Sequence, residues 1–324
     1  MPKVSVITPI YQTEEYLAKC FQSLTNQTLS DIELIWIDNG ANETCKKLIA
    51  EHKTAAVKLI VLPENIGYMG AMNTGLNAAT GDYVSFCDSD DWVDTDYYEN
   101  LYKTAETENA DVVLSPYFLE KSETQRIVSL LRDIPPKNAA DLFETQKYGC
   151  IWNGLYRRAM IERHHIRLPD GMKSIFRDNL FFIQTALYAG KSALQPMAGY
   201  HYILHDNSTT WGISRSIRKK AAMETLTELS QIVPADLMQK SERELSFFLT
   251  RSLEISVLDR EQAASLKIFE TLPSLAQIYT EIKNYKNPTI GQRLFSISRN
   301  LLKSRIKIRL LGFAVSFKYR KDSK

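Results

Sequence analysis

The chain has few of the features that mark secreted, membrane-spanning or zinc-knuckle proteins. Only four of its 324 residues are cysteine, and no two of them form a C-x-x-C pair. This spacing argues against a zinc knuckle and a disulfide framework, so we expect reduced thiols. No stretch of the sequence reaches the ~18 consecutive apolar residues that a transmembrane helix needs. We therefore expect no membrane span.

Targeting and common nucleotide-binding motifs are missing as well. The apolar run Val4 to Ile10 lacks the charged n-region and the small-residue cleavage site of a signal peptide, so none is expected. The patterns G-x-x-x-x-G-K-[ST], H-E-x-x-H and G-x-S-x-G do not occur, and Gly67 and Gly70 do not fit G-x-G-x-x-G. Walker-type ATPases, zincins, α/β hydrolases and ordinary dehydrogenases are therefore disfavoured.

Charge is unevenly distributed, although the formal net charge is only +2. Residues 293–324 hold ten Lys or Arg and one acidic residue, so this tail carries +9 and the remaining chain −7. Apolar residues recur in the tail at roughly helical intervals, which is typical of an amphipathic helix on an anionic membrane surface; a solvated helix is the alternative. An acidic body is not expected to bind nucleic acid. We expect a cytoplasmic protein, peripheral at the inner face of the cell membrane.

The N-terminal third of the chain alternates between short apolar runs and segments with helical spacing. Strands are predicted over Val4–Thr8, Ile32–Ile37, Val57–Leu62, Tyr83–Cys87 and Asp111–Leu114, and helices over Glu14–Leu24, Asn42–Glu51, Gly67–Ala79 and Thr95–Thr107. Nearly continuous apolar strands separated by helices indicate an α/β fold. We expect a Rossmann-like, mostly parallel sheet with helices on both faces.

The pattern changes after Tyr117. It loosens as far as Lys147, and Pro135-Pro136 breaks any helix there, which predicts a long excursion over the surface. Farther along, we predict strands over Trp152–Tyr156 and Met197–Leu204, and helices over Arg158–His164, Asp178–Ala189, Ala221–Ile232, Leu237–Leu258 and Ala264–Tyr285. Residues 1–212 would form the main domain, and residues 213–324 a helical C-terminal region ending in the basic tail.

Acidic residues follow two of the predicted strands directly. Asp38-Asn39-Gly40 ends the second strand and Asp88-Ser89-Asp90-Asp91 the fourth. Parallel sheets bind ligands at the carboxyl ends of their strands. Carboxylates so close together repel unless a cation holds them, and Mg²⁺ and Mn²⁺ bind carboxylates together with substrate phosphates. The pattern indicates a metal site at this edge, with an acidic turn that caps the next helix as the alternative.

Several motifs together resemble a known family. They are Lys3 to Tyr11 (KVSVITPIY), Ser23 to Thr28 (SLTNQT), Ile37 to Gly40 (IDNG), Asn73 to Leu76 (NTGL), Gly81 to Val84 (GDYV) and Asp88 to Trp92 (DSDDW). In order and spacing they resemble the family 2 glycosyltransferases, inverting enzymes of the GT-A fold. Trp152 to Arg158 and Phe176 to Phe182 resemble the acceptor-side half of that domain.

The resemblance implies sugar transfer from a nucleotide diphosphate, with UDP expected, to a hydroxyl of a glycan or lipid-linked acceptor. The setting would be bacterial surface polysaccharide or lipopolysaccharide biosynthesis, and the enzyme could form a homo-oligomer. By the resemblance, Asp38 would accept a hydrogen bond from the nucleotide base, with Pro9 and Tyr11 packing around base and ribose. Asp88 and Ser89 would contact the nucleotide sugar.

The remaining matched positions concern the metal and the acceptor. Asp90, with Asp88 beside it, would hold the Mn²⁺ or Mg²⁺ that bridges the diphosphate. His205 could join as a metal or phosphate ligand or be an ordinary loop histidine. Trp152, like Trp211, could stack on an acceptor sugar or pack in the core. Asp178 would be the general base that displacement at an anomeric carbon requires; a helix N-cap is the alternative.

Four residues depart from the pattern of the family. Asn39, Ala41 and Met72 replace a frequent Asp, Ser and Arg. Arg177 replaces the Glu that often precedes the catalytic Asp. Asn39, Met72 and Arg177 keep open a second hypothesis, a catalytically inactive nucleotide-sugar-binding subunit of a glycosylation complex. A nucleotidyltransferase is disfavoured, because Thr8 to Gln12 offers no glycine-rich, basic triphosphate loop.

Overall fold

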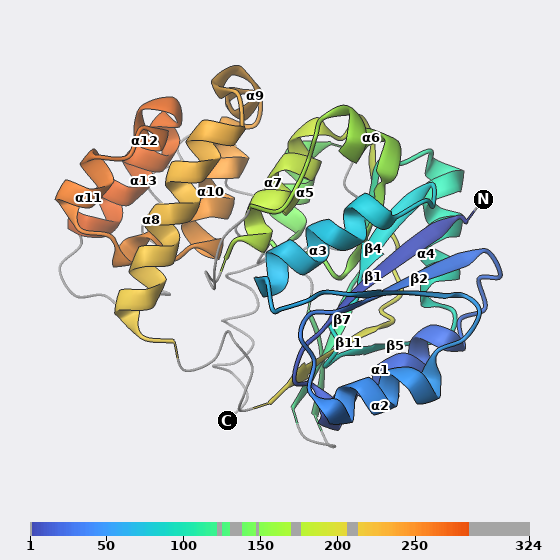
Figure 1. Cartoon of the computed structure of the whole chain (residues 1–324). Coiled ribbons are helices and arrows are strands. Elements are labelled where there is room, and N and C mark those ends of the chain that lie inside the picture. The colour runs from blue at the N-terminus through green and yellow to red at the C-terminus, as the bar shows by residue number, and fades with distance from the viewer. Residues whose placement is uncertain are drawn as a thin grey trace, which may run out of the picture.

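The computed structural model describes residues 2–121, 125–129, 138–146, 149–169, 176–205 and 213–284. Its central sheet comprises β1 (Val4–Ile10), β2 (Ile32–Asp38), β3 (Val57–Val61), β4 (Tyr83–Phe86), β6 (Val112–Leu114), β9 (Gly154–Arg157) and β10 (Ser192–Leu194). The spatial order of these seven strands is β10-β6-β9-β4-β1-β2-β3 (Figure 1). The return from β3 to β4, on the far side of β1, places the carboxyl ends of β1, β2 and β4 next to one another.

The sheet is mostly parallel, as predicted. β1 pairs in parallel with both β2 and β4, whereas β9 is antiparallel to β4 and β6. The strand predicted to begin at Trp152 begins at Gly154, and it is antiparallel to both of its neighbours. All seven residues of β1 are buried, and so are the last five of β2, which requires cover on both faces of the sheet.

The helices of this part lie close to their predicted positions. They are α1 (Glu14–Thr25), α2 (Glu43–His52), α3 (Gly67–Ala78), α4 (Tyr97–Glu108), α6 (Arg158–Arg163) and α7 (Asp178–Tyr188). In α1, Leu17, Cys20, Phe21 and Leu24 form the buried stripe that the spacing predicts. Asn42 caps the N-terminus of α2, because its side chain accepts a hydrogen bond from the Cys45 amide at 2.9 Å.

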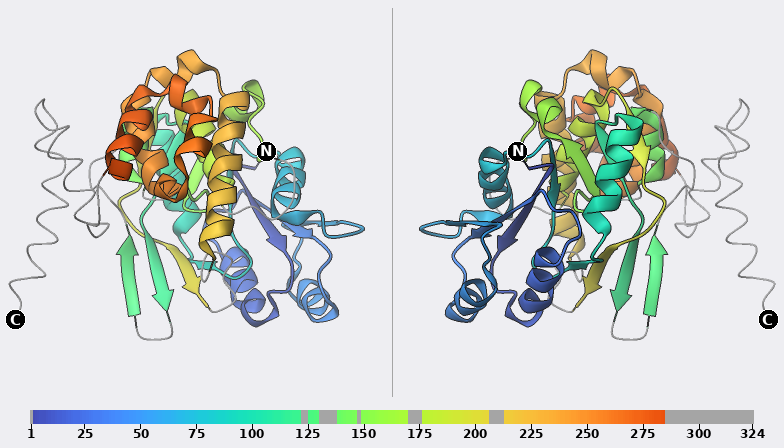
Figure 2. Two further views of the ribbon diagram at one scale, coloured as in Figure 1. Left: turned by 90° about the vertical axis from the view of Figure 1, so that its left-hand side faces the viewer. Right: turned by 90° about the vertical axis from the view of Figure 1, so that its right-hand side faces the viewer.

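The predicted surface excursion after Tyr117 is wrong in large part. A second sheet, in the order β5-β11-β7-β8, is built from β5 (Trp92–Val93), β7 (Tyr117–Lys121), β8 (Gln125–Ser129) and β11 (Tyr200–Leu204), and α5 (Ala139–Thr145) follows. Figure 2 shows the green β7–β8 hairpin beside β11. β7 pairs in parallel with β11, far along the chain, and that partnership leaves no short-range signal.

The chain after Ile213 is helical but more divided than predicted. It forms α8 (Arg215–Ile232), α9 (Ala235–Gln239), α10 (Glu242–Ser252), a 3₁₀ turn (Ile255–Val257), α11 (Arg260–Ala264), α12 (Ile268–Thr271) and α13 (Pro273–Asn284). The single predicted helix over 237–258 is wrong, because it breaks at Ser241 and again at Glu254, whose φ is +49°. The predicted helix over 264–285 also breaks, and Pro273 starts a new helix at the position where proline is best tolerated.

This helical region lies beside α5 and α7, away from α1 and α2 (Figure 1). The Phe248 ring lies 5.4 Å from the Phe143 ring and 5.2 Å from the Phe182 ring. Arg251 donates hydrogen bonds to the carbonyl oxygens of Phe143 and Gln146, at 2.8 and 2.6 Å. The predicted domain boundary at 212/213 falls next to undescribed residues and stays a prediction. Within the described ranges, no helix is long and apolar enough to cross a bilayer.

Candidate active site

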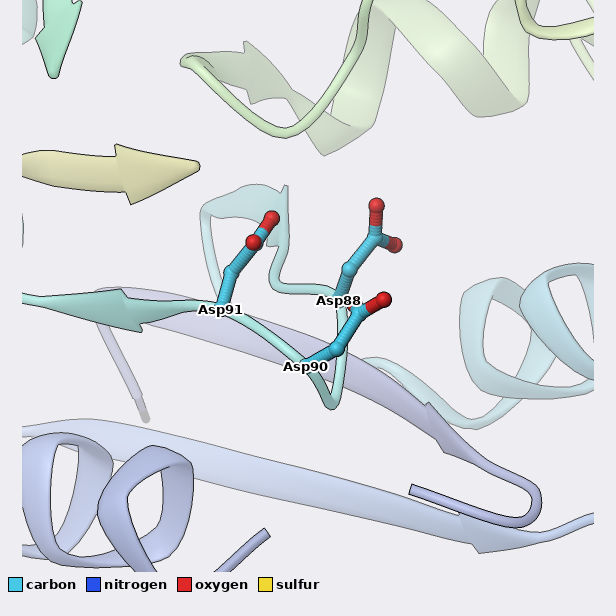
Figure 3. A group of neighbouring side chains, drawn as sticks. All are labelled: Asp88, Asp90 and Asp91. Carbon is cyan, nitrogen blue, oxygen red and sulfur yellow. The ribbon is translucent and has the colours of Figure 1, made fainter. Parts of the chain in front are cut away.

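Three aspartates rise from the turn that joins β4 to β5. The ligand atoms of Asp88, Asp90 and Asp91 lie within 4.8 Å of one another (Figure 3). β4 is buried along its whole length, and the turn follows the carboxyl end of this strand. The predicted acidic cluster is therefore assembled where the sequence placed it.

Asp91 is buried and has hydrogen-bond partners within the protein. It is 1% exposed, its Oδ2 accepts a hydrogen bond from the Tyr200 hydroxyl at 2.7 Å, and its Oδ1 accepts one from the Ile203 amide at 2.8 Å. The Tyr200 oxygen also accepts a hydrogen bond from the Asp88 amide at 3.1 Å. Burial raises the pKa of Asp91 well above its ordinary value. Asp91 thus joins the turn to β11, and Asp88 and Asp90 are the carboxylates open to a cation.

Asp88 is held by a hydrogen bond and lies close to other carboxylates. The Tyr68 hydroxyl, from the first turn of α3, donates a hydrogen bond to Asp88 Oδ1 at 2.6 Å. Burial and then the charge of Asp90 raise the pKa of Asp88 to about 7, while Tyr68 opposes this and the Asp178 charge adds to it. A divalent cation would relieve this repulsion, so the donor set fits a hard metal ion.

The other side of the turn contacts His205 and α1. His205 Nε2 lies 3.0 Å from Asp90 Oδ2, and the His205 ring stacks on Tyr16 at 4.7 Å between centroids. The Thr13 hydroxyl donates a hydrogen bond to the Ser89 hydroxyl oxygen at 2.9 Å. The structure brings His205 to the acidic turn; its role as a metal or phosphate ligand stays a prediction.

The predicted nucleotide-binding residues share the same edge of the sheet. Pro9 pairs with Ile37 near the carboxyl ends of β1 and β2, and Asp38 is the last residue of β2. Asp38 is buried and its Oδ1 accepts a hydrogen bond from the Ala41 amide at 2.7 Å. Tyr11, just beyond β1, is 42% exposed. These positions suit a ligand at this edge, and the nucleotide contacts stay predictions.

Asp178 is the first residue of α7. Its Oδ1 accepts a hydrogen bond from the Asn179 amide at 3.1 Å, and burial raises its pKa to about 6. The Asn179 side chain donates to the Phe176 carbonyl and accepts from the Gly149 amide, both at 2.9 Å. A Cβ at Gly149 would lie 2.7 Å from the Asn179 Cα, so only glycine fits there. The side chain of Asn179 therefore holds the first turn of α7, which contains Asp178.

Comparison with known proteins identifies the family. The sequence model described as "Glycosyl transferase family 2" matches residues 5–164. This part of the chain belongs to that family. It is 28% identical to EpsH of Bacillus subtilis (strain 168) over 322 residues, which cover 96% of this chain and 93% of EpsH.

Two solved structures share the GT-A fold of this glycosyltransferase. TarS 1-349 of S. aureus in complex with UDP-GlcNAc has a TM-score of 0.66 at 19% identity, over 85% of this chain and 81% of that one. The mannosyltransferase PcManGT of Pyrobaculum calidifontis, in complex with GDP-Man and Mn²⁺, has a TM-score of 0.54 at 14% identity, over 100% and 88%. The predicted fold class is confirmed.

Two departures from the pattern of the family have structural explanations in this glycosyltransferase. The Asn39 amide nitrogen donates hydrogen bonds to Asn65 Oδ1 and to the Gly67 carbonyl at 3.2 Å, and Asn39 Oδ1 accepts one from the Ile66 amide at 2.9 Å. A carboxylate could not donate the first two. Met72 lies on α3 and is fully buried in the core. The packing of the structure accommodates both residues.

Trp152 lies among aromatic rings. It is 8% exposed and stacks on Tyr200 at 4.5 Å and on Tyr202 at 5.2 Å, with the edge contact of Tyr117 at 4.7 Å. These contacts describe packing, and an acceptor contact of Trp152 stays a prediction. Trp211 lies outside the described residues.

Sequence reasoning missed the tyrosines that position the acidic turn. Tyr68 follows Gly67 at the start of α3, where a strand-to-helix loop at the same edge of the sheet could have indicated it. Tyr200 and Tyr16 left no such signal, because their roles depend on where β11 and His205 lie in space.

Proposed function

We propose that this glycosyltransferase is an inverting, metal-dependent enzyme that moves a sugar from a nucleoside diphosphate to a hydroxyl of a glycan acceptor. The acidic turn after β4 carries the proposal, because the ligand atoms of Asp88, Asp90 and Asp91 lie within 4.8 Å of one another. The Asp178 charge, at the start of α7, also adds to the raised pKa of Asp88, so a base at Asp178 could act beside a metal-bound diphosphate.

The residues present fit a hard divalent ion. Asp88 and Asp90 would supply carboxylate oxygens, and His205 an imidazole nitrogen, which suits Mn²⁺ better than Mg²⁺. Once bound there, Mn²⁺ or Mg²⁺ would neutralise the charge that develops on the departing diphosphate. Asp91 would only orient the turn, because it is buried and held by hydrogen bonds from Tyr200 and Ile203.

Asp178 would take the proton in the transfer step. The acceptor oxygen forms a bond to the anomeric carbon while the bond from that carbon to the diphosphate oxygen breaks, and the electron pair leaves with the nucleoside diphosphate. Attack from the face opposite the leaving group inverts the anomeric configuration. With a pKa of about 6, Asp178 is ionised at neutral pH yet more basic than an ordinary aspartate.

The donor is proposed to be a UDP-sugar. The TarS complex contains UDP-GlcNAc and has the higher TM-score, whereas the PcManGT complex contains GDP-Man. Pro9, Tyr11 and Asp38 would contact the base and ribose, and Ser89 the sugar nucleotide beside Asp88. The proposed acceptor is a glycan or lipid-linked intermediate in bacterial surface polysaccharide assembly.

A thermal-shift panel tests the donor assignment. UDP, GDP, CDP and ADP are each compared with and without Mn²⁺; a ligand at ~100 times its Kd stabilises by ~2.7 kcal/mol. We expect UDP with Mn²⁺ to give the largest shift, and a larger shift with GDP would overturn the choice of base. Release of UDP from UDP-sugars, by transfer or slow hydrolysis, then distinguishes an enzyme from the inactive binding subunit.

The basic tail, residues 293–324, lies outside the described residues, and its attachment to an anionic leaflet stays a proposal. Each Lys or Arg near such a surface contributes ~1 kcal/mol, and salt weakens the attraction. Deleting residues 290–324 should abolish co-sedimentation with anionic vesicles and leave nucleotide binding intact. Equal binding to neutral vesicles, or no effect of the deletion, would contradict the proposal.

A further inference from the structure

Arg177 connects the candidate base to the helical C-terminal region. It directly precedes Asp178, and its side chain is only 14% exposed. Its guanidinium lies 3.5 Å from Glu228 Oε2 (through Nη1) and 3.9 Å from Glu224 Oε2 (through Nη2). Both glutamates belong to α8. A charged contact therefore runs from the helical region to the residue next to Asp178.

A cation near the two glutamates reduces the repulsion between them. Glu224 and Glu228 stand four residues apart on one helix, where like charges repel by ~0.2–0.5 kcal/mol at an exposed surface. They are only 35% and 24% exposed, so water screens them less. Lys220 also reaches Glu224, at 3.8 Å, but is 79% exposed. The planar fork of Arg177 is the more buried cation, and it can serve both carboxylates.

The backbone before Asp178 also needs support. Phe176 has a φ of +73°, in the left-handed region that costs a non-glycine residue ~1–3 kcal/mol. The side-chain amide of Asn179 holds this turn from one side, because it donates a hydrogen bond to the Phe176 carbonyl. The contact of Arg177 with α8 holds it from the other side. The first turn of α7 is thus fixed by two independent attachments, one of which comes from the helical region.

We propose that Arg177 is a positioning residue: held by Glu224 and Glu228, it fixes the first turn of α7 and so the direction of the Asp178 carboxylate. The helical region then takes part in catalysis without touching substrate. The glutamate frequent at this position in the family would face two glutamates here, which gives the departure a physical reason. The inference rests on the proposed role of Asp178 as the base.

Charge exchange between Arg177 and α8 tests the inference. Arg177→Met keeps the apolar stem and removes the charge; since a displacement of ~1 Å can cost ~10²-fold, we expect kcat to fall ~10- to 100-fold. The donor KM should stay within about twofold, because ground-state donor binding does not use Arg177. The double variant Arg177→Glu with Glu228→Arg should recover more kcat than either single variant. Arg218→Met is the matched control. Arg218 lies on α8, like Glu224 and Glu228, and it pairs with Glu254 at 3.2 Å, away from Asp178 in the chain.

Amide hydrogen exchange over residues 177–182 gives a readout that does not depend on activity. Exchange should be faster in Arg177→Met than in the wild type or in Arg218→Met, and slower again in the double variant. Unchanged kcat and exchange in Arg177→Met, or equal losses in Arg177→Met and Arg218→Met that follow thermal stability, would overturn the inference. If Arg177→Met does not fold, Arg177→Lys, which keeps the charge and loses the fork, serves the same comparison. A wild type that binds donor but transfers nothing would refute the proposed function, while exchange still decides the positioning role.

Discussion

The two carboxylate regions of the site are held in different ways. After β4, side chains from distant elements fix each aspartate: Tyr68 bonds Asp88, His205 contacts Asp90, and Tyr200 bonds Asp91. Asp178 instead accepts a hydrogen bond from the backbone of its own helix, and burial raises its pKa. Crowded charges suit a bound cation, whereas a single carboxylate suits proton transfer. We therefore propose donor binding at the first region and proton transfer at the second.

Asp178→Asn is the strongest test of this separation. A carboxamide cannot accept the acceptor proton, so turnover should fall by ~10²–10⁴-fold. Donor affinity, measured by thermal shift with Mn²⁺, should be unchanged. A variant that keeps more than about a tenth of wild-type turnover would show that Asp178 is only part of the first turn of α7.

Asp90→Asn should produce the opposite defect. Loss of a ligand should weaken the Mn²⁺-dependent part of nucleotide affinity by at least ~10–100-fold, the range seen when even supporting residues of metal sites are lost. Titration of UDP by calorimetry, with Mn²⁺ and with EDTA, measures it. Asp82→Asn, an exposed aspartate at the other end of β4, is the control and should bind normally. Undiminished Mn²⁺-dependent affinity in Asp90→Asn would refute the metal assignment.

The pH dependence of turnover sharpens the contrast. Asp178 must be ionised to accept a proton, so kcat should be low below its pKa of about 6, rise through that pH and level off above it. The profile is measured from pH 5 to pH 8 with saturating donor and Mn²⁺, so that bound cation keeps Asp88 ionised. A rate that stays constant down to pH 5 would exclude Asp178 as the titrating base.

Tyr200→Phe should have the smallest effect, and it should be on stability. It removes a donor from the buried Asp91 and an acceptor from the Asp88 amide, which should lower the free energy of unfolding by ~1–3 kcal/mol. Urea unfolding measures the change. Tyr11→Phe, at an exposed tyrosine, should unfold like the wild type. Equal midpoints for the two variants would mean that the link from Asp91 to β11 adds nothing to stability.

Most of the central sheet could be predicted because its elements carry local periodicity, although no strand was predicted over β10 (Ser192–Leu194). β1, β2 and α1 each have an apolar pattern of the right length, and their observed bounds differ from the predicted ones by one or two residues. The pairing of β7 with β11 and the break at Glu254 could not be predicted, whereas Pro273 marks the start of α13 in the sequence itself. The pairing and the break depend on partners far along the chain, or on a local backbone reversal such as that at Glu254.

The sequence by itself determined the strands β1 to β4 and β6, the acidic turn after β4 and the family. Local spacing and short motifs carry those features. Only the tertiary structure decided which aspartates are available, since Asp91 is buried beside Tyr200 and Ile203 whereas Asp88 and Asp90 are partly exposed. It also decided that Arg177 contacts α8, because a hydrogen bond or ion pair between residues far apart in the chain exists only once packing has brought them within a few ångströms.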